Sequence, residues 1–356
     1  MKTIRNKYLD VYKDKKVLIT GHTGFKGSWL CLVLKILGAK VYGYSLKPKN
    51  SYSNFYLNKL DKNMNNLFGD IRDYKKLDKY ISKVKPNIVF HLAAQALVKD
   101  SYIDPIKTFS TNIMGTANIL NIIKNKKFVK SFICITSDKC YENKEWIHGY
   151  RENDQLGGID PYSSSKASAE IIFSSFLRSI FDLKKRGYAT ARAGNIIGGG
   201  DWSDNRIVPD AIRSIIQKKK LFLRNPNSTR PWEHVLEPIN GYLKLGYHLY
   251  REPEKFTGSW NFGPSNNKRK TVKDLVDLLF KILKKGKIKT QNKKKNFYES
   301  KELQLNCEKS NKYLEWRTKW NFEKTVLKTA EWYQAFDNNE DMLKVSTKQI
   351  KEFLYD

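Results

Sequence analysis

From Lys16 onward, the first half of the chain alternates short apolar runs, which predict buried strands, with longer amphipathic stretches, which predict helices. The predicted strands are 16–20, 41–45, 66–68, 87–91, 131–136 and 189–193. The predicted helices are 25–37, 74–84, 105–124 and 162–185. Alternation of this kind is typical of a parallel sheet with helices on both faces. The sequence therefore predicts an α/β fold with a doubly wound parallel (Rossmann) sheet.

Beyond about residue 195 this regularity is lost, and clusters of glycine and proline separate helices predicted at 209–219, 271–283 and 323–336. A chain of 356 residues is long enough for two domains. We expect residues 1–195 to form the Rossmann domain. Residues 196–356 are expected to form mainly a smaller, irregular substrate-binding domain that is partly interleaved with the first.

A G-x-x-G-x-x-G turn separates the first predicted strand from the first predicted helix. Glycines there permit a tight turn and a close approach of the backbone to a pyrophosphate, and the helix N-terminus offers free N–H groups to the phosphates. The pattern predicts dinucleotide binding. The turn residues expected to hold the cofactor are Gly21, Thr23, Gly24, Phe25, Lys26 and Gly27.

The choice between NAD and NADP stays open. The acidic residue expected about 20 positions after the turn is missing, because no Asp or Glu occurs between Ser28 and Leu60. Ser45 stands at the end of the second strand instead, and Lys47 would tolerate a 2′-phosphate. Asp70 follows the third strand and is placed to hold the adenine amino group, or else to cap a turn. The remaining cofactor contacts are expected at Ile71 and Ala93.

Tyr162 and Lys166 stand four residues apart, one helical turn, and so on the same face. A phenol cannot act as a base at neutral pH unless a nearby cation lowers its pKa. Lys166 and a positive nicotinamide ring are expected to do this. The pair follows a strand that ends in Thr136-Ser137-Asp138-Lys139.

These motifs make the chain resemble the extended short-chain dehydrogenase/reductases that act on nucleotide sugars. The motifs that carry the resemblance are GHTGFKG, HLAAQ, TSDK, YSSSK and RAGNIIGGGDW, in family order over roughly residues 10–336. GHTGFKGSWL, TSDKCYEN, NRIVPD and RPWEHV resemble the CDP-glucose 4,6-dehydratase branch. CDP as the nucleotide rests on this resemblance alone.

The resemblance implies a mechanism. Tyr162 takes the proton of the sugar 4-hydroxyl while hydride leaves C4, Asp138 protonates the 6-hydroxyl, and hydride finally returns to C6. Lys139 stands where dTDP-sugar dehydratases have a glutamate base. It would remove the C5 proton, or instead orient Asp138 or stabilise the enolate. Ser137 is expected to bond the 4-hydroxyl and relay its proton, and Lys166 completes the catalytic set.

The substrate's diphosphate calls for cationic contacts, and arginine offers two donors in a fixed fork. Arg206 and Arg230 are the candidates, although Arg230 could instead stack on Trp232 at the surface. Asn195 resembles a pyrophosphate-facing asparagine of the family. Gln95 and Tyr102 follow the fourth strand, beside the edge where such sheets bind ligands. The histidines lack metal-ligand spacing, so no metal is expected.

The net charge is +30, from 66 Lys+Arg and 36 Asp+Glu. Lysine is spread along the whole chain, and the densest run, 284–301, carries no nucleic-acid-binding motif. We therefore expect the charge to attract a phosphorylated substrate rather than nucleic acid. The polar N-terminus, the lack of a long apolar run and cysteines without CxxC spacing predict a cytoplasmic protein with no membrane span.

Together with these features, the resemblance implies a cytoplasmic, NAD-dependent 4,6-dehydratase that converts CDP-D-glucose to CDP-4-dehydro-6-deoxy-D-glucose and water. The resemblance also implies a homodimer formed through helices that begin near residues 105 and 162. One alternative is a 4-epimerase, or a dehydratase of another nucleotide sugar. Asp138 and Lys139 argue against an epimerase, which needs no acid and base around C5 and C6. A non-catalytic dinucleotide- or nucleic-acid-binding protein is the alternative of another class.

Overall fold

The computed structural model describes residues 7–264, 270–290 and 302–355. At its centre lies a seven-stranded sheet of order β11-β6-β5-β4-β1-β2-β3, in which all neighbouring strands are parallel. Its strands are β1 (Lys16–Thr20), β2 (Lys40–Ser45), β3 (Asn65–Phe68), β4 (Ile88–His91), β5 (Ser131–Ile135), β6 (Gly187–Ala193) and β11 (Gly258–Phe262). The predicted doubly wound α/β sheet is confirmed.

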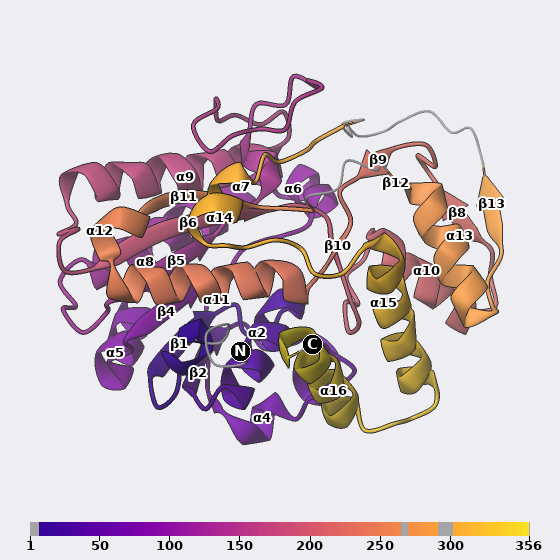
Figure 1. Ribbon diagram of the computed structural model, residues 1–356, viewed down its shortest axis with the longest axis horizontal. Coiled ribbons are helices and arrows are strands. Elements are labelled where there is room, and N and C mark those ends of the chain that lie inside the picture. The colour runs from indigo at the N-terminus through magenta and orange to yellow at the C-terminus, as the bar shows by residue number, and fades with distance from the viewer. Residues whose placement is uncertain (1–6, 265–269, 291–301, 356) are drawn as a thin grey trace.

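Helices cover both faces of this sheet (Figure 1). Ile88 and Phe90 of β4 point into one core cluster, which α2 (Phe25–Ile36) and α11 (Leu236–Arg251) cover. Val89 points into the other, which α5 (Tyr74–Val84), α8 (Gly115–Ile123) and α9 (Pro161–Ser179) cover. Strands buried on both faces are largely apolar, which is why their runs were readable in the sequence, although β6 also buries Thr190 and Arg192.

Two helices differ from the prediction. The helix predicted at 105–124 is a continuous series of α7 (Pro105–Phe109), a π-helical turn η1 (Ser110–Met114) and α8. The helix predicted to reach residue 185 ends at Ser179. It ends early because Phe181 stacks on Tyr188 of β6 with ring centroids 3.9 Å apart, which turns the chain back toward the sheet.

The chain returns to the large sheet after residue 195. β11 pairs with β6 at the edge of the sheet, and α11 packs against β5 and β6. A smaller domain that is partly interleaved with the first stays a prediction. The exact division at residue 195 stays a prediction.

Short elements make up the rest of the second half. Among the described residues, three two-stranded sheets pair β7 with β10, β9 with β12 and β8 with β13. Their strands are β7 (Ile196–Ile197), β8 (Leu221–Leu223), β9 (Thr229–Arg230), β10 (Glu233–His234), β12 (Lys270–Thr271) and β13 (Ile288–Thr290). The larger helices are α10 (Ile207–Ile216), α13 (Val272–Leu283), α15 (Phe322–Asp337) and α16 (Met342–Tyr355).

In Figure 1, α10, α13, β8 and β13 gather beyond one end of the sheet, while α16 packs against α2 and α15. The first three larger helices lie close to the ranges predicted at 209–219, 271–283 and 323–336. The short helices are α1 (Lys7–Asp10), α3 (Asn54–Leu57), α4 (Leu60–Asn63), α6 (Val98–Ile103), η2 (Asp138–Cys140), α12 (Pro253–Phe256) and α14 (Glu308–Tyr313).

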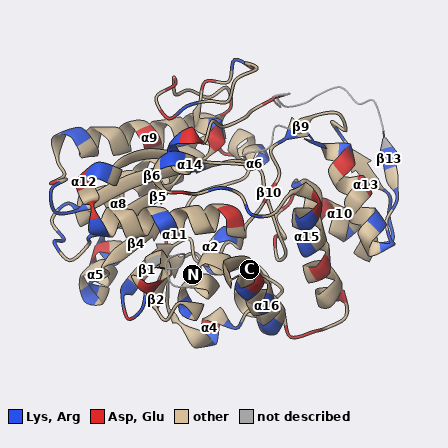
Figure 2. Cartoon of the chain, viewed as in Figure 1, with Lys and Arg blue, Asp and Glu red and all other residues tan. Residues whose placement is uncertain are grey.

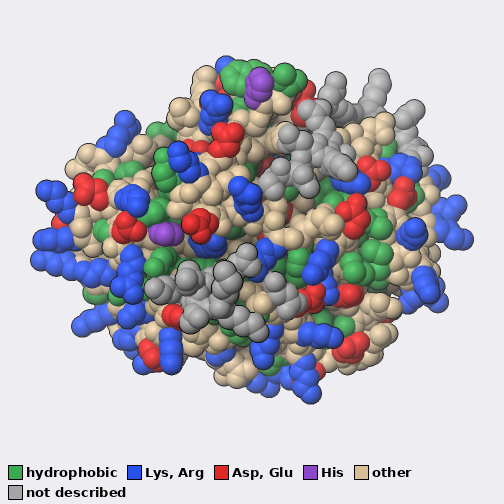
Figure 3. Space-filling model, in the orientation of Figure 1, with side chains coloured by type: hydrophobic (Ala, Val, Ile, Leu, Met, Phe, Trp, Pro, Cys, Tyr) green, Lys and Arg blue, Asp and Glu red, His purple; other side chains and the backbone are tan. Residues whose placement is uncertain are grey.

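The charged side chains are distributed over the molecule. Lys and Arg occur on helices and loops throughout the chain (Figure 2), and they project from all sides of the face in Figure 3. Part of the lysine run at 284–301 lies outside the described residues. All four cysteines are buried with free thiols. None of the helices in the described part of the chain is both long and apolar enough to span a membrane.

Candidate active site

The glycine turn after β1 is tight. Gly21 has φ +75°, and a Cβ there would lie 2.7 Å from the backbone nitrogen of Ala93. A Cβ on Gly27 would lie 2.1 Å from the carbonyl oxygen of Gly21. A Cβ on Gly24 would meet only that same oxygen, at 3.4 Å. The turn thus has no room for side chains on its inner side and is open at Gly24, so it fits a dinucleotide's pyrophosphate at the N-terminus of α2.

Other predicted cofactor residues stand at or after the carboxyl ends of β1, β2, β3 and β4, with Ala93 two positions after β4. Thr23 and Ser45 share a 2.6 Å hydrogen bond between their hydroxyls. The carboxylate of Asp70 accepts two hydrogen bonds from the Arg72 guanidinium, at 3.0 and 2.6 Å, so this part of the site is partly engaged already. The side chain of Ile71 is buried, which leaves only its backbone for a ligand.

Three predicted catalytic side chains meet where β5 ends and α9 begins. Ser137, Asp138 and Tyr162 are 7%, 4% and 9% exposed. The hydroxyl of Ser137 donates to Oδ1 of Asp138 at 2.9 Å. Burial raises the pKa of Asp138, against the opposing charges of Lys139 and Arg230. A buried carboxyl whose pKa is raised suits a general acid.

Tyr162 differs from the expectation that Lys166 lowers its pKa. Burial raises the pKa of Tyr162 to about 12, and the hydrogen bond with Ser137 and the charge of Arg206 only partly oppose this. The Lys166 ammonium instead donates to the carbonyl oxygen of Ile135 at 3.4 Å. The chain's own charges therefore leave Tyr162 protonated, and the phenolate would require a further positive charge beside it.

A buried ion pair lies one turn beyond Lys166 on α9. Glu170 accepts hydrogen bonds from Nε and Nη2 of Arg192 at 3.0 and 2.8 Å, and from the Thr190 hydroxyl at 2.8 Å. Burial alone would raise the pKa of Glu170, but the charge of Arg192 and the hydrogen bonds from Arg192, Thr136 and Thr190 together outweigh it, and the pKa is lowered. Burial lowers the pKa of Lys166, and Glu170 opposes this. The pair thus fixes α9 to β6 and supplies negative charge near Lys166.

The loop after β4 is fixed by its own hydrogen bonds. The side-chain amide of Gln95 donates to the carbonyl oxygen of Leu97 and to the Thr108 hydroxyl, each at 3.0 Å. Asn112, in the π-helical turn, donates to the Gln95 carbonyl at 3.0 Å and to Ser165 at 2.8 Å. The donors of the Gln95 amide are thus used within its loop, and Asn112 links that loop to α9. π-Turns often occur at functional sites.

The predicted substrate residues from the second half reach the same region. Arg206 donates to Asp201 at 3.1 Å, and its charge acts on Tyr162. The charge of Arg230 acts on Asp138. The carbonyl of Asn195 accepts from the backbone N–H of Glu233 at 3.2 Å. Two further predicted residues come from the first half. Tyr102 on α6 is 36% exposed. Lys139, which follows Asp138 in the chain, is half-buried.

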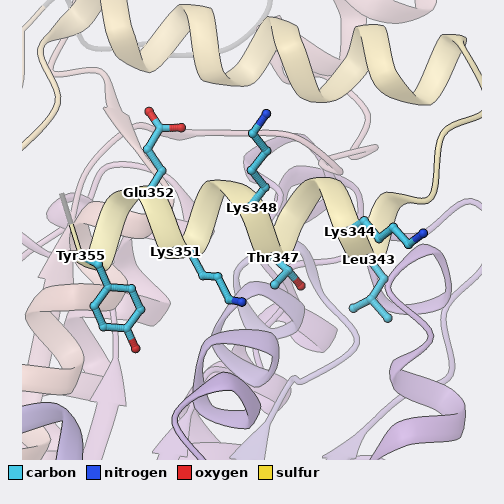
Figure 4. A pocket seen from close by; sticks show the side chains of 7 residues that line it. All are labelled: Leu343, Lys344, Thr347, Lys348, Lys351, Glu352 and Tyr355. Atoms are coloured by element: carbon cyan, nitrogen blue, oxygen red, sulfur yellow. The ribbon is translucent and has the colours of Figure 1, made fainter.

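A hollow elsewhere on the surface lies along α16 (Figure 4). All of its lining residues belong to that one helix, and Glu352 among them pairs with Lys328 at 2.8 Å. It therefore has the character of an open helix face rather than an enclosed site. Within the described part of the chain, no group of three or more His, Cys, Asp or Glu side chains is arranged to hold a metal ion.

Comparisons with known proteins agree with this geometry. The family model described as GDP-mannose 4,6 dehydratase matches residues 18–329. The chain belongs to the GDP-mannose 4,6-dehydratase family. The chain is 43% identical to the CDP-glucose 4,6-dehydratase of Salmonella typhimurium, over 96% of this chain and 97% of that protein. The family predicted from the motifs is confirmed.

Solved structures support the same fold. An epimerase of Methanothermobacter thermautotrophicus has a TM-score of 0.80 at 20% identity, and covers 94% of this chain and 97% of its own. The dTDP-glucose 4,6-dehydratase of Bacillus anthracis, solved in complex with NAD, has a TM-score of 0.75 at 21% identity, over 92% and 99% of the two chains. At these identities the likeness shows only that this chain shares the fold of these two proteins.

Sequence reasoning missed the buried Glu170–Arg192 ion pair and the buried carboxyl of Glu233. Glu170 and Arg192 lie 22 positions apart, and a glutamate on the Lys166 face of α9 was the one available signal. Lys26 was named for its place in the glycine turn, but the buried Glu233 near it was not. That proximity arises only from tertiary packing.

Proposed function

We propose that this protein is a 4,6-dehydratase of CDP-D-glucose that forms CDP-4-dehydro-6-deoxy-D-glucose and water. The observation that carries the proposal is the buried Ser137–Asp138 pair beside Tyr162: a carboxyl whose pKa is raised by burial, next to the phenol that would take the 4-hydroxyl proton. An epimerase needs no such acid. CDP as the nucleotide is supported by the 43% identity to the CDP-glucose 4,6-dehydratase of Salmonella typhimurium.

NAD is the cofactor that we propose, with Gly21, Gly24 and Gly27 around its pyrophosphate and Thr23 and Ser45 near its ribose. When bound, it accepts hydride from C4 and returns it to C6. NAD rather than NADP is supported by the dTDP-glucose 4,6-dehydratase of Bacillus anthracis, solved in complex with NAD. Burial raises the pKa of the Tyr162 phenol to about 12. The positive charge of the oxidised nicotinamide ring would stabilise the phenolate and so lower this pKa.

The side chains act in sequence. Tyr162 takes the 4-hydroxyl proton through its hydrogen bond with Ser137, and Lys166 stands one turn away on the same helix. The new 4-ketone acidifies the C5 proton, which Lys139 removes. Asp138 protonates the departing 6-hydroxyl and so forms water. The proton that Lys139 holds then returns to C5 as hydride reaches C6, so the sugar is not oxidised overall.

The substrate's diphosphate would bind Arg206 and Arg230, with Asn195 beside it and Tyr102 at the sugar end. The charge of Arg230 acts on Asp138 and that of Arg206 acts on Tyr162, which supports a diphosphate bound next to the catalytic side chains. Gln95 is the weakest of the predicted contacts, because the loop uses its amide donors. The alternative role of Lys139, orienting Asp138, is supported by its charge next to that carboxyl.

We further infer a cytoplasmic homodimer. The four buried free thiols support a reducing compartment. The dimer is supported by exposed apolar side chains on the neighbouring α6, α7, η1 and α9. These are Ile103 at 73%, Ile106 at 74%, Met114 at 55% and Ile171 at 56% exposed.

The decisive experiment incubates the protein and NAD with CDP-, dTDP-, UDP- and GDP-hexoses and follows each sugar by mass spectrometry. We expect CDP-glucose to lose one water. Conversion without a mass change would identify an epimerase, and water loss from another nucleotide sugar alone would reassign the substrate. No conversion together with salt-sensitive retention on DNA would favour the binding protein.

A further inference from the structure

His91 is a buried histidine that the proposed mechanism does not use. It ends β4, is 2% exposed, and lies opposite Thr20, the last residue of β1, in the parallel pairing of the two strands. Its ring packs against that of Phe132 on β5, with centroids 6.4 Å apart and planes at 22°. Burial lowers the pKa of His91 to about 3, and the charge of Lys166 acts in the same direction. At neutral pH the imidazole is therefore uncharged, with one N–H donor and one acceptor nitrogen.

Both ring nitrogens of His91 have a threonine hydroxyl as partner. Nδ1 lies 2.7 Å from Oγ1 of Thr20, and Nε2 lies 3.3 Å from Oγ1 of Thr116 on α8. The two threonines are buried as well, at 0% and 3% exposed. Because a hydroxyl has a single hydrogen, the other contacts of these threonines decide which ring nitrogen carries the proton.

The contacts of Thr116 place that proton on Nε2. Its hydroxyl donates to the backbone carbonyl oxygen of Asn112 at 2.7 Å, and a carbonyl oxygen can only accept. The hydrogen of Thr116 is thus used, so its oxygen accepts from Nε2–H of His91. Nδ1 then has no hydrogen and accepts from the Thr20 hydroxyl, whose oxygen in turn accepts from the backbone N–H of Ala93 at 3.3 Å. The hydrogen bonds therefore run in one direction, and every donor in the chain has an acceptor.

This chain connects the two sides of the candidate site. On the cofactor side, Ala93 lies beside the glycine turn, since a Cβ on Gly21 would lie 2.7 Å from its backbone nitrogen. On the catalytic side, the side-chain amide of Asn112 donates to the Ser165 hydroxyl at 2.8 Å, and that hydroxyl donates to the backbone carbonyl of Tyr162 at 2.7 Å. The imidazole is the link between the strands β1 and β4 and the helical segments α8, η1 and α9.

We propose that His91, as the Nε2–H tautomer, is a positioning residue that holds the cofactor-binding turn in a fixed place relative to the helix of Tyr162. The proposal rests on the function proposed above, in which hydride passes between C4 of the sugar and the cofactor beside this phenol. A misplacement of about 1 Å can slow such a step by roughly 100-fold. His91 would therefore act on the rate of hydride transfer rather than on the affinity for the sugar.

The first experiment determines the tautomer by NMR, in protein labelled with ¹⁵N at its histidines. The His91 signals are assigned in the wild type through backbone correlations, so that no variant of this buried residue has to fold. We expect one protonated and one unprotonated ring nitrogen, with the hydrogen on Nε2, between about pH 6 and pH 9. A hydrogen on Nδ1, or on both nitrogens, overturns the proposal.

The second experiment breaks the chain at Thr116. Thr116→Val keeps the shape of the side chain without the hydroxyl, and Thr116→Ser keeps the hydroxyl. In Thr116→Val the His91 ring is no longer held at Nε2, so the Ala93 amide hydrogen should exchange with solvent about five-fold faster. The Leu92 amide, which donates to the backbone carbonyl of Thr20 at 3.0 Å, should keep its rate. Thr116→Ser should match the wild type. Equal effects of Thr116→Val on Ala93 and Leu92, or none on either, overturn the link.

The same variants test the effect on catalysis. We expect Thr116→Val to lower kcat for CDP-glucose about ten-fold and to raise the isotope effect of deuterium at C4, with KM changed by less than about two-fold. Thr116→Ser should restore both values. A loss of folded protein alone would leave the isotope effect unchanged, and that result overturns the positioning role. If the wild type converts no nucleotide sugar but the tautomer and the Ala93 exchange are as expected, the proposed function fails and the link stands.

Discussion

The Ser137 hydroxyl donates a 2.9 Å hydrogen bond to Oδ1 of Asp138, and both side chains are buried at the carboxyl end of β5. This bond leaves Oδ2 of Asp138 to carry the proton that a leaving hydroxyl would need. Because the Ser137 side chain also interacts with Tyr162 and lowers the pKa of its phenol, one hydroxyl connects the proposed base for the first step with the proposed acid for the second.

Asp138→Asn is the first variant that this arrangement predicts. The amide keeps the shape of the carboxyl but cannot give a proton to the leaving group, whereas Tyr162 and Lys166 remain for the oxidation of C4. We expect water loss to fall by roughly 10²- to 10⁴-fold, with persistent absorbance of reduced nicotinamide. Asp182→Asn, at an exposed position, is the control. Wild-type turnover in Asp138→Asn would remove Asp138 from the mechanism.

Alanine substitutions at Gly24 and Gly27 should have different effects, the first on NAD binding and the second on folding. A Cβ on Gly27 would lie 2.1 Å from the Gly21 carbonyl oxygen, so Gly27→Ala must distort the turn and should lower the melting temperature. At Gly24 the same contact is 3.4 Å and the turn is open. Gly24→Ala should therefore fold normally yet bind NAD at least ten-fold more weakly, because the methyl group occupies the approach to the pyrophosphate. Calorimetric titration with NAD measures this. Unchanged affinity in Gly24→Ala would place the pyrophosphate elsewhere.

Much of the first half could be predicted because its strands are buried on both faces, and because its turn and YSSSK motifs stand at fixed places along them. α11 could not be predicted, since Gly241 and Gly246 interrupt its helical pattern. Both glycines serve packing: a Cβ would lie 2.4 Å from the Phe262 ring at Gly241 and 2.4 Å from the Tyr12 hydroxyl at Gly246. Local pattern does not record such contacts.

The candidate site shows the same limit. The positions of Ser137, Asp138, Tyr162 and Lys166 followed from motif spacing, but the pKa of Tyr162 did not, because burial depends on the whole packed environment. Glu233 could not be connected with the glycine turn, since 206 intervening residues separate it from Lys26. The spacing of motifs in the sequence predicts at which strand end a catalytic side chain lies. The charged groups that surround this side chain depend on tertiary packing.

Breaking the Glu170–Arg192 pair should be costly. Glu170→Gln leaves the Arg192 guanidinium buried without its counter-ion, a change that typically costs about 3–5 kcal/mol. Glu252→Gln is the control, because its pair with Lys255 is exposed and worth at most about 1 kcal/mol. The lowered pKa of Glu170 means that its contribution is complete above its unfolded value of 4.5 and is lost as the pH falls through the folded pKa. Urea unfolding at pH 7 and below pH 4 measures both effects. Equal losses in the two variants at pH 7 would contradict this assignment.

The apolar side chains on α6, α7, η1 and α9 predict how the protein associates. An aspartate in place of Ile106, which is 74% exposed, would place an unpaired charge in the proposed interface. We expect the wild type to sediment as a dimer and Ile106→Asp as a monomer. Ile147→Asp is the matched control, because Ile147 is equally exposed, at 77%, but lies in the loop between β5 and α9. A monomeric wild type, or equal dissociation by both substitutions, would show that these helices do not form the interface.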